Sequence, residues 1–273
     1  MRNPPFYSKF KKMFRQECFC PWVSSFISTF VKTAVTEPKA LFNLRSLRER
    51  SFGILWMKNG AAISEEMPGN IDKLLAEARG VVLDLGPGTG EQMHRFTADN
   101  IKAMYGAEPG LSMHPSILRR AKETGLAEKY HLLGCGAEKE SLIPALAKDG
   151  ILGEGASEGI FDEIMCVRVL CAVPRHEETI QNLYKLLKPG GRMVVCEHVR
   201  NSCCMGGSFL GGAFQSLYAM LAWNFFLCCH LRRDTAKVLK EAGGKNGWAK
   251  INLQLIGEHG PVPFIVGDMI KAA

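Results

Sequence analysis

Several patterns that would place this chain of 273 residues in a simple class are missing from its sequence. The ten cysteines contain no C-x-x-C spacing and no matching histidine ladder, so the spacing predicts no structural zinc site and no other bound metal. No cleavage pattern follows the basic N-terminus, which argues against a secretory signal. Cys166, Cys171 and Cys196 lie in apolar runs, as cysteines of a reducing compartment often do, and we predict a cytoplasmic protein.

Strong charge imbalance is also missing outside the N-terminus. Charged residues make up 22% and apolar residues 47%, which are ordinary globular values. The net charge of +7 comes largely from a basic cluster at the start of the chain (Arg2, Lys9, Lys11, Lys12 and Arg15). A membrane surface explains this cluster as well as nucleic acid does, and a solvated terminus explains it more simply. We therefore expect no nucleic-acid partner and leave a peripheral membrane contact through the N-terminus open.

A charge-free run over residues 18–31 follows that cluster. It is too short to cross a bilayer but could lie on one. The alternative, which we favour, is a helix packed over a ligand cleft.

The most informative stretch is residues 81–91, which read VVLDLGPGTGE. An apolar strand runs into Asp84, and Gly86, Gly88 and Gly90 follow at alternate positions. Glycines at this spacing after a strand indicate a loop whose backbone approaches a ligand closely. The dinucleotide fingerprint G-x-G-x-x-G would need a glycine where Glu91 stands, which argues against a nicotinamide or flavin cofactor.

An acidic residue followed by G-x-G-x-G resembles the first motif of class I S-adenosylmethionine-dependent methyltransferases. The resemblance implies S-adenosyl-L-methionine as the cofactor and a site at Asp84, Gly86, Gly88 and Gly90. Glu108 lies 22 positions beyond Gly86, at the end of the next expected strand, where a carboxylate can accept from both ribose hydroxyls.

Four further positions complete the predicted cofactor site. The family commonly has an acidic residue in a G-D-A-E-like run after the third strand, where it meets the adenine amino group. Gly136 stands at that aspartate position here, so we expect Ala137, Glu138 or backbone groups to serve instead. Pro109 and Arg168 are the other two predicted cofactor contacts.

The run LYKLLKPGGRMVVCEHV, residues 183–199, resembles the corresponding segment of ubiquinone-type methyltransferases. We therefore predict an α/β fold: a Rossmann-like, seven-stranded class I methyltransferase sheet with helices on both faces. A helical cap over residues 1–70 would precede the methyltransferase domain at 71–273. After the glycine loop we expect a helix at 91–99 and a strand at 101–107. A strand at 161–167 should continue through 168–173. The last helix should run from 232 to 242 with Asp234 as its N-cap, and strands at 251–256 and 264–270 should form a final antiparallel pair.

Residues 201–231 contain no Asp, Glu, Lys or Arg. A membrane span here would put the two halves of one sheet on opposite sides of a bilayer, so we predict an apolar insertion after the fifth strand that caps the substrate. Its glycines favour a helix only over residues 214–227. Such a cap implies a small hydrophobic or aromatic substrate, or docking against lipid.

The candidate general base is His198, at the carboxyl end of the fifth strand, with Glu197 placed to orient it. A merely packed histidine is the alternative, and His230 is the next candidate. A phenol, with a pKa of about 10, benefits from such a base more than a thiol of about 8.5 does.

Three functions remain open from the sequence. VLCAVP, EHV and LCCHLRRDT look like both fungal O-methyltransferases of aromatic polyketides and animal membrane-associated thiol methyltransferases. We predict first an O-methyltransferase of an aromatic hydroxyl in secondary-metabolite biosynthesis. The second prediction is a thiol or lipid methyltransferase at a membrane surface, and the third is a non-catalytic binding protein with this fold. RNA or protein methylation is less favoured, because no N-P-P-Y-like tetrapeptide follows the fourth strand. The sequence gives no indication of oligomeric state.

Overall fold

The computed structural model describes residues 19–273 except residues 66, 153–157, 204–205 and 221–227. Its strands form one seven-stranded sheet in the order β3-β2-β1-β4-β5-β7-β6. The first five pair in parallel, whereas β7 runs antiparallel to both β5 and β6. The strands are β1 (Gly80–Leu85), β2 (Ile101–Ala107), β3 (Tyr130–Leu133), β4 (Phe161–Val167), β5 (Leu187–His198), β6 (Trp248–Ile256) and β7 (Phe264–Lys271). The predicted sheet and its final antiparallel pair are confirmed.

Helices cover both faces of this sheet because its central strands are apolar on both sides. Val82, Met165 and Val194 point to the face covered by α4 (Ile71–Ala76) and α5 (His114–Glu123). Neighbouring strand residues point to the other face, covered by α6 (Lys139–Lys148), α7 (His176–Leu186) and α10 (Thr235–Glu241). Asp234 caps α10 by accepting from the Lys237 backbone N–H, as predicted. Short 3-10 turns, η4 (Leu111–Met113) and η5 (Ala127–Lys129), complete the connections.

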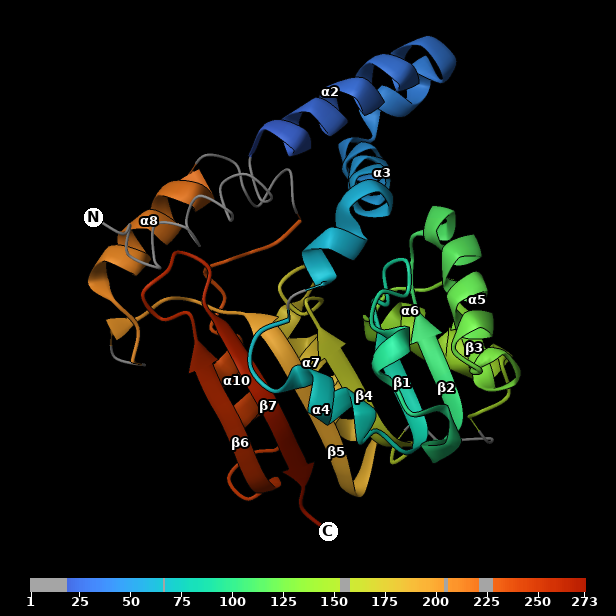
Figure 1. Cartoon of the computed structure of the whole chain (residues 1–273), viewed down its shortest axis with the longest axis vertical. Helices are drawn as coiled ribbons and strands as arrows, with labels where there is room; N and C mark the ends of the chain where they lie inside the picture. Colours follow the sequence, from blue (N-terminus) through green and yellow to red (C-terminus); the bar gives the residue numbers. More distant parts are fainter. Residues whose placement is uncertain (1–18, 66, 153–157, 204–205, 221–227) are drawn as a thin grey trace, which may run out of the picture.

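The N-terminal segment lies beyond the carboxyl ends of the parallel strands (Figure 1). It comprises α2 (Phe19–Thr36), η1 (Pro38–Phe42) and α3 (Leu44–Ser64). The helix α8 (Phe209–Met220), from the charge-free segment, lies on the same side. Within the described ranges, no helix has both the length and the apolar character needed to span a bilayer.

The predicted helix at 91–99 is wrong. Two 3-10 turns, η2 (Met93–Arg95) and η3 (Ala98–Asn100), take its place. Phe96 is extended between them and buries its ring in the core. The following Thr97, Asp99 and Asn100 are all weak helix formers, so little local preference favours an α-helix over this stretch before β2 begins.

Two other predicted boundaries are corrected. β4 ends at Val167 and does not continue, because Arg168 takes a positive φ of 57° and turns the chain. The helix expected at 214–227 begins earlier, at Phe209, and its predicted end lies outside the described residues. Gly211 is tolerated inside α8 because a Cβ there would lie 2.7 Å from the Gly260 carbonyl oxygen, so close packing requires glycine.

Candidate functional site

The principal cavity opens at the carboxyl ends of β1 and β4, where the strand order reverses. Ligands of doubly wound sheets bind at such a switch point. Its volume is about 770 Å³. The walls come from the glycine loop, the ends of β1, β2 and β4, the helix α3, and the segment after α8. None of the α2 side chains that the structure describes lines it, and α3 supplies that wall. The start of the first charge-free run, which we expected over the cleft, lies outside the described side chains.

The glycine loop depends on the absence of side chains. Gly86, Gly88 and Gly90 have φ values of 62°, 63° and 84°, a region that L residues rarely adopt. A Cβ at Gly88 would overlap the indole nitrogen of Trp56, and one at Gly86 would lie 2.6 Å from Val169 Cγ2. The loop backbone therefore packs directly against α3 and the turn after β4.

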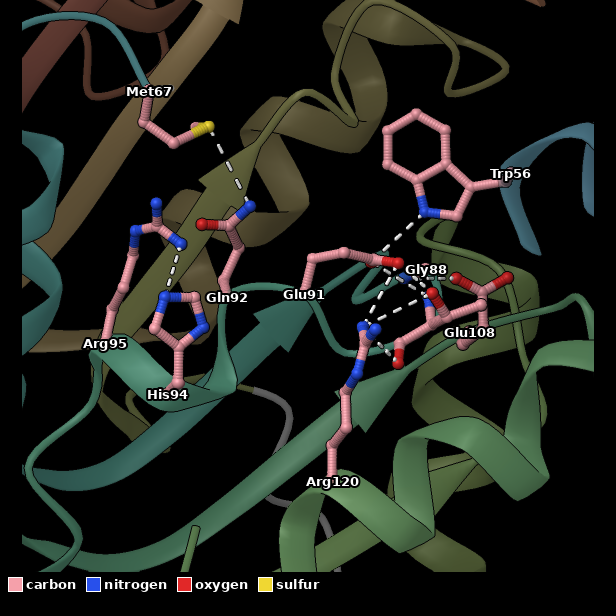
Figure 2. A network of polar contacts seen from close by, with 10 residues as sticks. Trp56, Met67, Gly88, Glu91, Gln92, His94, Arg95, Glu108 and Arg120 are labelled. Atoms are coloured by element: carbon pink, nitrogen blue, oxygen red, sulfur yellow. Dashed lines mark hydrogen bonds and ion pairs between the residues drawn. The ribbon is translucent and has the colours of Figure 1, made fainter. Parts of the chain in front are cut away.

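A buried carboxylate holds this loop from within. Glu91 Oε2 accepts from the Thr89 backbone N–H (3.1 Å) and from Trp56 Nε1 (3.2 Å) (Figure 2). The Thr89 hydroxyl donates to Glu91 Oε1, and Arg120 pairs with the same carboxylate at 3.2 Å. Sequence reasoning used Glu91 only to reject the dinucleotide motif. Its burial and partners show that it fixes the loop between α3 and α5.

Glu108 bridges the glycine loop and the turn after β2. Its Oε2 accepts from the Gly88 backbone N–H at 3.1 Å (Figure 2). Its Oε1 accepts from the Gly110 N–H at 2.8 Å. Burial raises the pKa of Glu108 to about 7, although both hydrogen bonds act to lower it. The carboxylate lines the cavity next to Pro109 and has further lone pairs for two adjacent hydroxyls.

Asp84 lines the same cavity at the end of β1. Burial raises its pKa to about 7, against the hydrogen bond donated by Tyr130 Oη at 3.3 Å. Gly106 makes this contact possible, since a Cβ on β2 there would overlap the tyrosine hydroxyl.

Of the remaining predicted cofactor positions, Pro109, Ala137, Glu138 and Arg168 line the cavity, whereas Gly90 lines a separate hollow with Arg95 and Arg120. Ala137 and Glu138 form the cavity wall after β3, and a Cβ at Gly136 would overlap the Glu138 carboxylate. Glu138 therefore occupies the space that an aspartate at position 136 would need. Arg168 lines the cavity from the turn after β4, and its Nη1 donates to the Ile63 carbonyl at 3.0 Å.

Glu197 has different contacts from those predicted. Its fully buried carboxylate accepts from the backbone N–H groups of Val169 (2.8 Å), Leu170 (2.9 Å) and Cys171 (3.4 Å). Burial raises its pKa to about 7. Its oxygens hold the turn after β4, whereas the predicted partner His198 follows it on the strand and points elsewhere.

His198 is absent from the described cavity lining. Its Nδ1 lies 3.4 Å from Cys229 Sγ and 3.8 Å from Cys171 Sγ, and its ring packs on Phe264 with centroids 4.3 Å apart. Hydrogen bonding from Cys171 and the nearby His198 lower the pKa of Cys229 well below its ordinary value. The second candidate base, His230, does line the cavity.

Comparison with known proteins agrees with this architecture. The sequence model of one family, described as a methyltransferase domain, matches residues 60–253. The chain belongs to this methyltransferase family. Its sheet has the class I methyltransferase fold, and its cofactor is S-adenosyl-L-methionine.

The names of two curated relatives specify different methyl acceptors. The human thiol S-methyltransferase TMT1A is 29% identical over 100 residues, which cover 37% of this chain and 38% of the relative. Sterol 24-C-methyltransferase ERG6 of Saccharomyces cerevisiae is 27% identical over 122 residues, covering 44% and 27% respectively. The alignments thus span well under half of each relative.

Solved structures share the fold at low identity. A protein described as a putative O-methyltransferase from Nostoc punctiforme superposes with a TM-score of 0.53 at 14% identity, covering 92% of this chain and 71% of its own. A geranyl diphosphate methyltransferase superposes with a TM-score of 0.51 at 12% identity, covering 81% of both chains.

The residues around the cavity fit the cofactor. The side-chain-free loop admits close backbone approach, and Glu108 is positioned at the strand end to accept from ribose hydroxyls. Arg168 and Glu138 lie on the walls to either side.

We expect Glu108→Ala to weaken S-adenosylmethionine binding by about tenfold or more, because the substitution removes both the hydroxyl acceptor and the bridge to Gly88. Calorimetric titration measures the affinity. The matched control is Glu241→Ala, an exposed carboxylate on α10, which should bind normally. Wild-type affinity in a folded Glu108→Ala protein would remove Glu108 from the cofactor site.

Glu197 makes stability depend on pH. The pKa of Glu197 in the folded protein, about 7, lies above its ordinary value of 4.5. The contribution of this residue to the free energy of unfolding is therefore fully present below about pH 4.5 and is lost as the pH rises through 7. Between about pH 5 and 7, the unfolding free energy of the wild type should fall relative to that of Glu197→Gln by about 1 kcal/mol or more. Denaturant unfolding measures the difference, with Glu178→Gln on the exposed surface as control. A difference independent of pH contradicts this prediction.

Proposed function

We propose that this methyltransferase transfers the methyl group to the sulfur of a small hydrophobic thiol. The observation that carries the proposal is the composition of the cavity on the β4 side. Phe52 and Val173 supply apolar wall there, and Arg48 and Arg233 supply positive charge, which the lining residue Glu49 offsets in part. His198, predicted as the base for a hydroxyl acceptor, is not among the described lining residues.

A thiolate suits these walls. The bound cofactor supplies an electrophilic methyl group on a positively charged sulfonium. A thiol ionises at a pKa of about 8.5, so nearby positive charge can provide the anion without a dedicated base. Arg233 is held in place by donating to the carbonyls of Leu170 and Val173, both at 2.8 Å. The remaining contribution of the protein is alignment of the nucleophile in an apolar cavity.

A hydroxyl acceptor is the second candidate, and His230 is the observation that favours it. The histidine lines the cavity together with Cys228 and Arg233. Desolvation, with the positive charge of Arg233, lowers the pKa of His230 below its ordinary 6.5. The ring is therefore neutral at pH 7 and able to accept a proton from a phenol.

Matched thiol and phenol substrates of the same carbon skeleton distinguish these acceptors. We expect higher kcat/KM for the thiol, with His230→Gln changing it by less than about threefold, whereas the same variant should lower phenol turnover by about tenfold or more. His259→Gln, an exposed histidine away from the cavity, is the control. Preference for the phenol would overturn the thiol proposal. Cofactor binding without turnover of either would favour the non-catalytic alternative.

We infer further that the acceptor is met at a membrane surface. α2 packs its polar side inward: Thr29 and Thr33 are each only 4% exposed, and Ser25 donates to the Ser51 carbonyl on α3. Its apolar side chains Ile27, Val31 and Val35, four residues apart, are 56%, 55% and 80% exposed. An apolar stripe turned away from the core is the pattern of an interfacial helix.

Sedimentation with vesicles containing anionic lipid tests this inference. We expect the wild-type protein to bind and the triple variant Ile27→Ser, Val31→Ser, Val35→Ser to lose most of its binding, because apolar area drives insertion. Ile251→Ser, which removes an exposed apolar side chain from β6, is the control and should bind normally. Binding that survives in the triple variant would exclude α2 as the contact.

A further inference from the structure

A compact group of soft ligands lies behind the cavity wall. Cys171, His198 and Cys229 each offer one ligand atom, and these atoms all lie within 4.8 Å of one another. Both cysteines are buried, and His198 is partly buried. Leu55 and Leu231 pack with the two cysteines in one apolar cluster, with Tyr218 and Val262 at its edge. The charged groups nearest to the cysteines are Arg233 and the Glu197 carboxylate, which accepts from the Cys171 backbone N–H.

We propose that Cys171, His198 and Cys229 bind a zinc ion. Zinc is commonly bound by thiolates and imidazoles, whereas magnesium and calcium bind oxygen ligands. Two cysteines and one histidine therefore suit zinc. With Zn–S of about 2.3 Å and Zn–N of about 2.0 Å, a tetrahedral site places sulfur and nitrogen roughly 3.5 Å apart. The observed separations of His198 Nδ1 from the two sulfurs, 3.4 and 3.8 Å, lie on either side of that value.

The chain holds each ligand in position by contacts that do not involve the other two. Cys171 lies on the turn fixed by the Glu197 carboxylate, and its carbonyl accepts from the His230 backbone N–H at 2.9 Å. His198 is the last residue of β5 and packs on Phe264. Cys228 has a positive φ of 55° and lines the cavity, whereas the adjacent Cys229 belongs to the ligand cluster.

Zinc here would join three segments that are distant in sequence. The turn after β4, the end of β5 and the end of the charge-free segment all meet at these ligands. Ala172, Val173, Cys228 and His230, which flank the cysteine ligands in sequence, line the cavity. The ion would therefore fix the wall that contacts the acceptor. Three protein ligands leave the fourth position to a solvent molecule.

The metal content of the 273-residue chain, purified with a non-thiol reductant and without chelator, tests the proposal. We expect about one zinc per chain in the wild type and less than about a tenth of that in Cys171→Ser, Cys229→Ser or His198→Ala. Cys203→Ser, which alters an exposed cysteine of the same charge-free segment, should retain the metal. Retention of zinc by Cys229→Ser and His198→Ala would place the ion elsewhere and overturn the assignment.

Two further tests use only the wild-type protein, so they remain valid even if the variants fail to fold. Cobalt in place of zinc should give thiolate charge-transfer absorption and intense tetrahedral visible bands. Removal of the metal with a chelator should lower Tm, and added zinc should restore it. A folded, cofactor-binding protein that neither takes up zinc nor shows these cobalt bands would refute the site. A Cys171–Cys229 disulfide recovered by non-reducing peptide mapping from such metal-free protein would identify the cluster as a thiol pair instead.

Discussion

Buried carboxylates that accept from backbone N–H groups are the constraint on which the ligand-binding edge of this sheet depends. Glu91 holds the glycine loop, Glu108 joins that loop to the turn after β2, and Glu197 holds the turn after β4. Each carboxylate is at most 6% exposed, so each is costly to ionise unless its N–H donors remain in place. The loops and the carboxylates thus stabilise one another, and the cavity between them is shaped before any ligand arrives.

The cofactor half of the site could be read from the sequence because its determinants are local. The glycines at alternate positions and Asp84 lie within one short stretch, and Glu108 follows at a spacing set by one helical connection and one strand. Strands buried on both faces leave unmistakable apolar runs, which is why β2 and β4 were predicted to the residue at their starts. The failed helix at 91–99 shows the converse: weak local propensity decided a segment that the fold family alone would have assigned as helical.

The acceptor half could not be read in the same way, since its parts come together only in three dimensions. Side chains alternate along a strand, so Glu197 and His198 of β5 face different directions, although their adjacency in sequence suggested a cooperating pair. Glu197 instead satisfies a turn that lies 26 to 28 residues earlier. Glu91 was overlooked for the same reason, because its partners Trp56 and Arg120 belong to helices that flank the loop from opposite directions in sequence.

Zinc prediction from sequence relies on ligand pairs at set spacings such as C-x-x-C, and this sequence has no such spacing. Cys171, His198 and Cys229 are separated by about thirty residues each, so only the sheet topology brings them together. The parallel pairing of β4 with β5 places the turn after one strand beside the end of the other, and the charge-free segment returns to the same point before α10. A histidine aimed at two buried sulfurs in an apolar cluster requires a polar reason for its placement, since its Nδ1 would otherwise be desolvated against weak hydrogen-bonding partners. A shared cation supplies that reason, and it assigns to His198 the positioning of the acceptor wall in place of proton transfer.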